Sequence, residues 1–194
     1  MQVRPCTFAG WQDAGAPQVR LVQGLSIDRD QARLQARAAL RACLAPGLGC
    51  DEGELQITNQ RGQAPRLLRR GEPLAVPHCS ISHAPGLALL AWCWSGPVGV
   101  DIQAIDTGAP RRELEAVVQL FLEPKTALAL IDIAQETLFL EAFATAWTQH
   151  EARLKCAGLG LVEWSGALEA RLAGIRSAEV PLGAAHAAAI ARRP

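Results

Sequence analysis

Apolar positions recur at two different spacings in the first half of the chain, and these spacings predict where helices and strands lie. Residues 26–49 carry leucines and alanines on one face behind a capping Ser26 or Asp28, and APGLG ends the run, which predicts a helix. The runs ELQIT, CSIS and LALLAWCW predict short strands, with the turn-rich loop NQRGQAP after the first. VGVDIQAI at 98–105 predicts the returning strand of a hairpin, joined to LALLAWCW by the tight connection SGP.

The second half repeats the order of a helix followed by strands. ELEAVVQLFLEP predicts a helix, a long helix follows around 134–157, and GLGLVEWSGALEARL predicts a loop and a strand. GAAHAAAIARR fits either a last alanine-rich strand or a short helix. The sequence therefore predicts an α+β fold of two similar halves related by a pseudo-twofold axis, each a helix packed on a small, mainly antiparallel sheet. The expected halves are residues 1–105 and 106–194.

One acidic residue interrupts the apolar strand at 98–105. Side chains alternate along a strand, so the face opposite the valines carries Gly99, Asp101 and Gln103. An acid in such a place lies more often at a polar surface than in a site. The rest of this strand is apolar, however, and Gly99 is expected to leave open space beside the acid. Asp101 is therefore a candidate functional residue.

A second acid continues an aromatic stripe in the long helix. Phe139, Phe143 and Trp147 recur every four residues and share one face, and the same spacing leads to Glu151 and Lys155. Taken alone, these last two form an ordinary exposed i,i+4 pair that stabilises a helix by about 0.2–0.5 kcal/mol. Together with Asp101, however, two carboxylates from separate elements make an oxygen site that suits Mg²⁺ and a substrate phosphate.

Charge and composition limit the function classes. The 194 residues are 49% hydrophobic and carry 19 basic and 19 acidic residues, so no overall field favours nucleic acid and an anion site must be local. One arginine does recur every four residues along the first predicted helix, at Arg29, Arg33, Arg37 and Arg41. These arginines either bind an anion or form a solvated face that nearby aspartates partly neutralise. No aromatic residue interleaves with them for base stacking.

The cysteines and the apolar runs predict a cytoplasmic protein without a membrane segment. Six cysteines show no CxxC pair and no metal-ligand spacing, and several lie in apolar runs, so reduced thiols are expected. The start MQVRPCTFAG lacks the apolar core of a signal peptide, and the longest apolar run, GLALLAWCW, is too short to span a bilayer.

Four motifs in register resemble the 4′-phosphopantetheinyl transferase superfamily. GVDI at 99–102, WTQHEARLK at 147–155 and the following GLG resemble its aspartate strand and its W-(S/T)-x-K-E-(A/S)-x-x-K helix. SISH at 80–83 is similar to the family's N-(I/L)-S-H segment, and RGQAP at 61–65 to its G-K-P loop. Order and length over roughly residues 20 to 165 fit the larger, monomeric, surfactin-synthetase-activating type better than the short trimeric type.

The resemblance implies transfer of the phosphopantetheine arm of coenzyme A to a serine of an apo acyl or peptidyl carrier protein, with release of 3′,5′-ADP. Carriers of nonribosomal peptide, polyketide or fatty-acid synthesis, or of a lysine-making reductase, would all suit. Asp101, Glu151 and the position of Gln103 would hold Mg²⁺, or Mn²⁺ in its place. Glu151 would also help to remove the serine proton, and Lys155 would stabilise charge on the bridging phosphate oxygen. The implied coenzyme A ligands are Arg20, Arg61, Gln63, Ser80, Ser82, His83 and Lys155.

The chain departs from the family pattern in three places. Gln103 replaces a frequent second acid, GQAP replaces G-K-P, and His150 stands where a lysine is usual. If His150 touches phosphate, coenzyme A should bind more tightly below about pH 6.5, where an imidazole gains charge. These changes leave open a second reading, a catalytically inactive relative that binds coenzyme A or a carrier protein.

Overall fold

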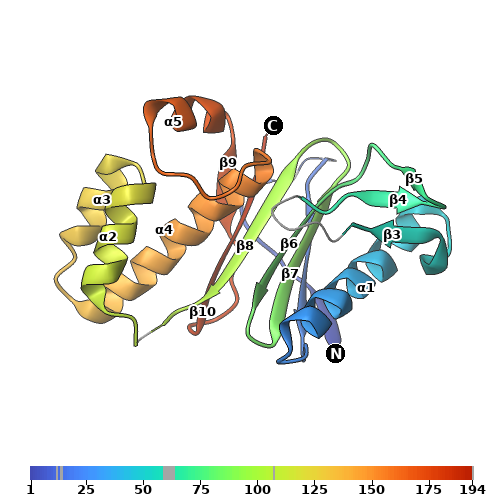
Figure 1. The fold of residues 1–194 in the computed structure, drawn as a ribbon, viewed down its shortest axis with the longest axis horizontal. Coiled ribbons are helices and arrows are strands. Elements are labelled where there is room, and N and C mark those ends of the chain that lie inside the picture. The colour runs from blue at the N-terminus through green and yellow to red at the C-terminus, as the bar shows by residue number, and fades with distance from the viewer. Residues whose placement is uncertain (12, 14, 59–63, 107, 194) are drawn as a thin grey trace.

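The chain folds as two helix-on-sheet layers whose sheets meet face to face (Figure 1). The computed structural model describes residues 1–194 apart from 12, 14, 59–63, 107 and 194. The described residues form five α-helices and three antiparallel sheets. This arrangement confirms the α+β fold class, with a helix packed on a principal sheet in each layer.

The N-terminal layer is a four-stranded sheet covered by helix α1 (Arg29–Leu48). The strand order is β1-β2-β7-β6, formed by β1 (Gln2–Pro5), β2 (Gln18–Gln23), β7 (Leu87–Cys93) and β6 (His78–Ala84). The side chain of Asp28, one of the two caps that the sequence allows, caps α1 by accepting from the backbone N–H of Gln31. Gly49 ends the helix with φ +58°, a left-handed conformation that glycine adopts at little cost.

A smaller sheet lies beyond α1. It contains β3 (Leu55–Ile57), β4 (Leu67–Arg69) and β5 (Glu72–Pro73) in that order. The sequence predicts only the first of these strands. Leu55 and Leu67 are buried and join the core beneath α1, so the small sheet extends the N-terminal layer.

The C-terminal layer is a three-stranded sheet with the order β8-β10-β9, covered by helix α4 (Glu136–Cys156). Its strands are β8 (Val98–Ala104), β9 (Arg176–Glu179) and β10 (His186–Arg192). The alanine-rich end of the chain is therefore a strand. Helices α2 (Arg111–Phe121) and α3 (Pro124–Ile131) pack against the first half of α4, and α5 (Gly166–Leu172) packs near its end.

The two sheets share one apolar core between them. Val98, Val100 and Ile102 of β8 point into it, as their alternation predicts, and they meet Leu21 of β2 and Leu89 of β7. Burying these branched side chains on both inner faces stabilises the contact between the halves by the hydrophobic effect. Because the valine face of β8 points into this core, Asp101 lies on the opposite face of the strand, toward α4.

The aromatic stripe of α4 is confirmed. Phe139 and Phe143 are buried, with ring centroids 6.3 Å apart, and Trp147 stacks on Phe143 at 6.1 Å. The stripe packs against α2, where Phe121 meets Trp147 edge to face at 5.9 Å. The first half of α4 is therefore fixed by core packing, and its second half extends along β8.

The strand predicted at 98–105 is present as β8, but its predicted pairing is wrong, and so is one later element. β8 pairs with β10 instead of returning beside β7 as a hairpin, because its valine face is needed between the two sheets. The segment predicted as loop and strand at 158–172 ends in the helix α5, which Ser165 caps by accepting from the N–H of Leu168. β8 pairs with the last strand of the chain, and this pairing favours a boundary between the halves before Val98. The expected division after residue 105 stays a prediction.

Two further expectations concern thiols and membranes. All six cysteines are free of disulfide bonds. Among the residues that the structure describes, no helix combines the length and the apolar character needed to cross a bilayer.

Candidate functional site

Asp101, Lys155 and Ser82 form a hydrogen-bonded cluster where β6, β8 and α4 meet. The Nζ of Lys155 lies 2.6 Å from Oδ1 of Asp101 and 3.2 Å from Oγ of Ser82. The Ser82 hydroxyl also contacts Oδ1 of Asp101, at 2.7 Å. The Asp101 side chain is 10% exposed and that of Lys155 is 30% exposed, so the cluster is partly screened from water. We call these three residues and Glu151 the Asp101 cluster.

Serines of β6 fix β8 in place across the junction of the two halves. The Oγ of Ser80 accepts from the backbone N–H of Val100 at 3.1 Å, and that of Ser82 accepts from Ile102 at 3.3 Å. Both serines are buried, so the bonds satisfy β8 amides that would otherwise be buried without a partner. Ser80 therefore supports the strand that carries Asp101, and Ser82 contacts both the strand and the acid.

Gly99 brings α4 directly onto β8. A Cβ placed at this glycine would lie 2.5 Å from the backbone nitrogen of Cys156 and closer still to the carbonyl oxygen of Ala152. The expectation of open space beside Gly99 is therefore wrong, because the helix backbone fills that space. This close approach explains why Lys155 of α4 reaches Asp101, two residues along the strand.

Glu151 lies one turn before Lys155 and is half-buried. Burial raises its pKa above the usual range, the charge of Lys155 lowers it, and the charge of Asp101 raises it again. The two carboxylates are thus close enough to repel each other, a repulsion that a cation relieves. Gln103 is half-buried further along β8 and offers an amide oxygen.

These donors fit a magnesium ion. Mg²⁺ is usually held by one or two carboxylates and takes its remaining ligands from waters and phosphates. Within the described residues, no three His, Cys, Asp or Glu side chains gather as a metal cluster. Asp101 and Glu151 supply two carboxylates, a number within the range that magnesium usually takes from a protein.

Basic side chains of α1 lie near His83 of β6, the residue that follows Ser82. Burial, and after it the charges of Arg37, Arg33, Lys155 and Arg29 in that order, lower the pKa of His83 to about 4. The pKa of Arg37 is itself lowered, by burial and then by Arg33. Crowded cations of this kind attract an anion, and the His83 ring among them is neutral near pH 7.

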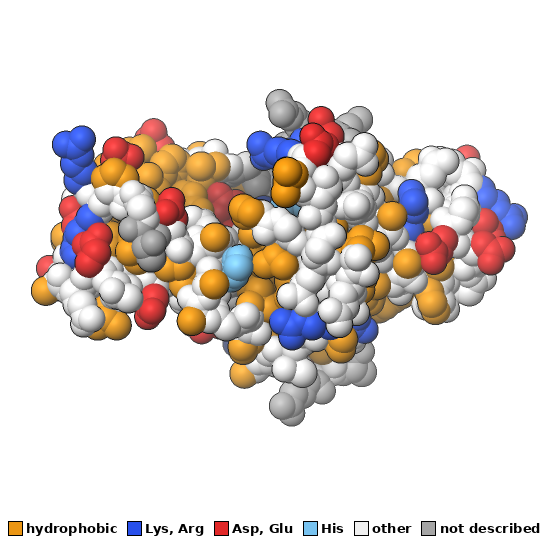
Figure 2. Space-filling model, turned by 90° about the horizontal axis from the view of Figure 1, so that it is seen from below, with side chains coloured by type: hydrophobic (Ala, Val, Ile, Leu, Met, Phe, Trp, Pro, Cys, Tyr) orange, Lys and Arg blue, Asp and Glu red, His pale blue; other side chains and the backbone are white. Residues whose placement is uncertain are grey.

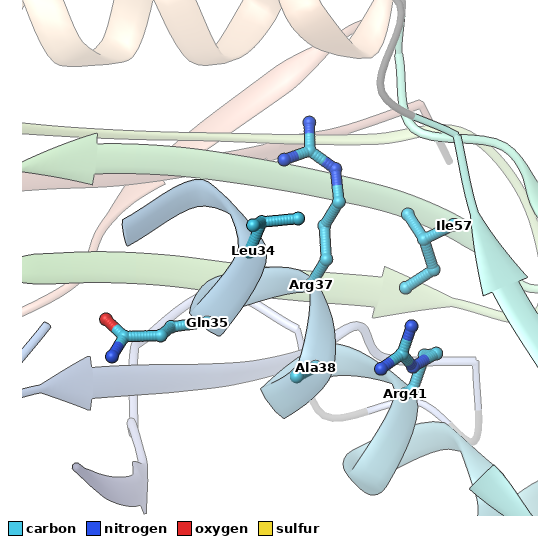
Figure 3. Close-up of a pocket in the computed structure, with 6 residues that line it drawn as sticks. All are labelled: Leu34, Gln35, Arg37, Ala38, Arg41 and Ile57. Atoms are coloured by element: carbon cyan, nitrogen blue, oxygen red, sulfur yellow. The ribbon is translucent and has the colours of Figure 1, made fainter. Parts of the chain in front are cut away.

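A groove of about 400 Å³ runs along the same face of α1. Figure 3 shows Arg37 and Arg41 extending from the helix beside Ile57 of β3, with Leu34 and Ala38 completing the wall. The Nε of Arg37 donates to the carbonyl of Thr58 at 3.2 Å. The groove thus adjoins the start of the loop in which the sequence predicts further ligands.

The structure does not bring every predicted ligand to the Asp101 cluster. Arg20 of β2 lies over the ring of Trp92 at 5.3 Å and donates to the carbonyl of Val19, so its contacts lie within the N-terminal sheet. Arg61 and Gln63 lie outside the described residues. Arg20 is therefore a predicted coenzyme A ligand that the described contacts place apart from the cluster.

His150 is buried and does not have the environment of a phosphate ligand. Its pKa is lowered to about 4, mainly by burial and then by the charge of Arg153, while the charge of Glu169 of α5 acts in the opposite direction. Its Nε2 has no hydrogen-bond partner among the described residues. A buried imidazole with this pKa is neutral at pH 6.5. The structure therefore does not support the hypothesis that a charged His150 attracts coenzyme A near that pH.

Sequence reasoning missed two features of the site. The bond between Ser82 and Asp101 joins residues 19 positions apart, and neither motif alone signals it. The position of Arg33 and Arg37 beside His83 was also missed, although their four-residue spacing did suggest an anion. Charges of both signs are interspersed over the face shown in Figure 2, so this basic group is local.

The site thus combines two carboxylates, a lysine and neighbouring arginines, and the chemistry of these groups suits a divalent cation and a phosphate-bearing ligand. Comparison with known families gives one match that agrees with it. Residues 97–188, just under half of the chain, match the model of the 4′-phosphopantetheinyl transferase superfamily. The matched segment contains Asp101, Glu151 and Lys155. No curated protein matches the chain.

Proposed function

We propose that this protein transfers the 4′-phosphopantetheine arm of coenzyme A to a serine of an apo carrier protein and releases 3′,5′-ADP. The observation that carries the proposal is the meeting of Asp101, Glu151 and Lys155, from two elements within the matched segment, beside the arginine face of α1. The reaction needs a cation site and a pyrophosphate site side by side, and the two carboxylates and the neighbouring cations support this proposal.

Asp101 and Glu151 are the proposed ligands of Mg²⁺, with Gln103 contributing its oxygen directly or through water. When bound, the ion would neutralise charge on the pyrophosphate and polarise the phosphorus that is attacked. Mn²⁺ has the same preference for oxygen ligands and should substitute. Ser82 orients the Asp101 carboxylate through the 2.7 Å bond between them.

Glu151 is the proposed base for the carrier serine. Burial and the charge of Asp101 raise the pKa of its carboxyl, which makes the carboxylate a better proton acceptor than an exposed glutamate. Lys155 provides a positive charge next to the leaving pyrophosphate oxygen, where charge builds up as the bond to phosphorus breaks. The acid and the amine lie one helical turn apart, so both can address one phosphate group.

Arg33, Arg37 and His83 are the proposed contacts for the nucleotide end of coenzyme A. The two guanidiniums act on His83, and Arg37 also lines the groove and donates to the carbonyl of Thr58. A guanidinium binds phosphate in a bidentate manner, so this face suits the 3′-phosphate. We also propose that the protein is of the surfactin-type subclass, monomeric and cytoplasmic. The experiment below identifies its carrier protein.

The test is an incubation of the protein with coenzyme A, Mg²⁺ and a panel of apo carrier proteins, read as the intact mass of each carrier. We expect a gain of one phosphopantetheine on at least one carrier. If every carrier keeps its mass while calorimetry shows that coenzyme A binds, the inactive relative is the better account. Reversion of Gln103 to an acid and of His150 to a lysine would then be the next step.

A further inference from the structure

The ammonium of Lys155 holds the carboxylate to which the proposed function assigns a divalent cation. It lies 2.6 Å from Oδ1 of Asp101, and the Ser82 hydroxyl donates to the same oxygen at 2.7 Å. A carboxylate oxygen has two lone pairs. Both lone pairs of Oδ1 are therefore engaged, and a cation that uses this oxygen must displace a donor.

Charge balance also makes Lys155 and a metal ion competitors. Lys155 is the cation whose charge offsets the two neighbouring carboxylates, since it lowers the pKa of Glu151 and pairs with Asp101. A divalent ion between these carboxylates would repel an ammonium that stays in place. A phosphate-bearing ligand removes that conflict, because it offers the ammonium another anion.

The choice of lysine fits a group that moves. The chain has two lysines, Lys125 and Lys155, among its 19 basic residues, so the site carries the less common basic residue of this protein. An ammonium is a compact charge on a flexible stem, whereas an arginine fork holds a carboxylate in a fixed geometry. The side chain of Lys155 is 30% exposed, which leaves it room to turn from Asp101 toward a ligand.

We propose that Lys155 is a displaceable counter-cation, which keeps Oδ1 of Asp101 occupied until a phosphate-bearing ligand draws the ammonium away. In consequence the divalent cation binds weakly by itself and more tightly together with the phosphate ligand. This inference rests on the proposed function, because it concerns the same metal and pyrophosphate site.

The test is the affinity of the protein for Mn²⁺ without coenzyme A, read from the electron paramagnetic resonance signal of free Mn²⁺. We expect Lys155→Met to bind Mn²⁺ about tenfold more tightly than the wild type, which corresponds to about 1.4 kcal/mol. Lys125→Met is the matched control, since Lys125 is exposed on α3, and it should bind as the wild type does. Lys155→Gln provides the same comparison should the methionine variant fail to fold.

Two further measurements separate the outcomes. The gain in Mn²⁺ affinity should disappear in the double variant Lys155→Met/Asp101→Asn. Adding coenzyme A should make the Mn²⁺ affinities of Lys155→Met and the wild type more similar. Unchanged or weaker Mn²⁺ binding by Lys155→Met would overturn the inference, as would a gain that survives Asp101→Asn. If the wild type modifies a carrier but Lys155→Met has the Mn²⁺ affinity of the wild type, the role of Lys155 as a counter-cation is contradicted and the proposed function is not. If Lys155→Met binds Mn²⁺ more tightly but the wild type modifies no carrier, the proposed function is contradicted and the role of Lys155 is not.

Discussion

At the level of single residues, the environment of each polar side chain separates the residues that can meet a substrate from those that stabilise the fold. Lys155 and Glu151 are half-buried and face Asp101, so they keep access to solvent and to a ligand. His150, next to Glu151 in sequence, is 7% exposed and lies against α5. One step along a helix turns a side chain by about 100°, which places these neighbours on different faces.

The buried His150 should make stability depend on pH. Its pKa in the fold is lowered to about 4 from an ordinary 6.5, so the unfolded chain binds the extra proton more readily. The stabilisation is complete above pH 6.5 and is lost as the pH falls toward 4, by as much as about 3 kcal/mol. Urea unfolding of the wild type and of His150→Gln between pH 4 and 7.5 should show a smaller pH slope in the variant.

The free energy of unfolding of His150→Gln should still depend on pH, and His83 contributes part of that dependence because its pKa is also lowered to about 4. The variant His83→Gln should therefore be measured beside His150→Gln. Equal slopes in the wild type and in His150→Gln would contradict the burial of a neutral imidazole at position 150.

The arginine face of α1 should determine the affinity for coenzyme A. Charge-assisted hydrogen bonds are worth about 1.5–3 kcal/mol each, so Arg33→Gln with Arg37→Gln should raise the KM for coenzyme A about tenfold or more. The KM for dephospho-coenzyme A, which lacks the 3′-phosphate, should change much less. Arg112→Gln, at an exposed position of α2, is the control.

The same variant tests another use of these arginines. An acidic carrier protein could dock on a basic helix face, and a rise in the KM for the carrier with the KM for coenzyme A unchanged would show that. The position of both arginines beside His83 favours coenzyme A.

At the scale of elements, the contact of α4 with β8 at Gly99 sets the geometry of the site. Gly99→Ala would place a Cβ against the backbone of α4 and should lower the free energy of unfolding by about 3 kcal/mol, as overpacking of a core does. Gly53→Ala has open space around it and should change the value by less than about 0.5 kcal/mol. Urea unfolding measures both, and equal effects would contradict the close packing.

Sequence patterns predicted the elements that are regular along their whole length. The α1 cap, the strand alternation at Val98, Val100 and Ile102, and the aromatic stripe of α4 all follow from local spacing. The partner of β8 did not follow, because a strand with one apolar face fits either a hairpin or a second sheet. Pairing with β10 is decided by burial between the sheets, which no local pattern encodes.

The site shows the same limit. The motifs pointed to Asp101, Glu151 and Lys155, and the structure brings all three to one place. The 2.7 Å bond of Ser82 to Asp101 depends on how β6 of one half meets β8 of the other. That contact is long-range, and spacing within either strand carries no information about it.

For the whole molecule, the junction of β6 and β8 joins the two halves at the site. Ser80→Ala would leave the buried N–H of Val100 without its 3.1 Å bond and should lower the free energy of unfolding by about 1–3 kcal/mol. The halves share one core, so unfolding should remain a single transition. Differential scanning calorimetry checks both points, and two separate transitions would contradict a shared core.

The central claim is that the Asp101 cluster, formed where the two halves meet, transfers phosphopantetheine. The most direct measurement is the rate at which an apo carrier gains mass with coenzyme A and Mg²⁺, compared between the wild type, Asp101→Ala, Glu151→Ala and the exposed control Glu141→Ala. We predict transfer by the wild type and by Glu141→Ala, and a loss of at least about a thousandfold in each of the other two. Transfer that survives both Asp101→Ala and Glu151→Ala would contradict the assignment of the site.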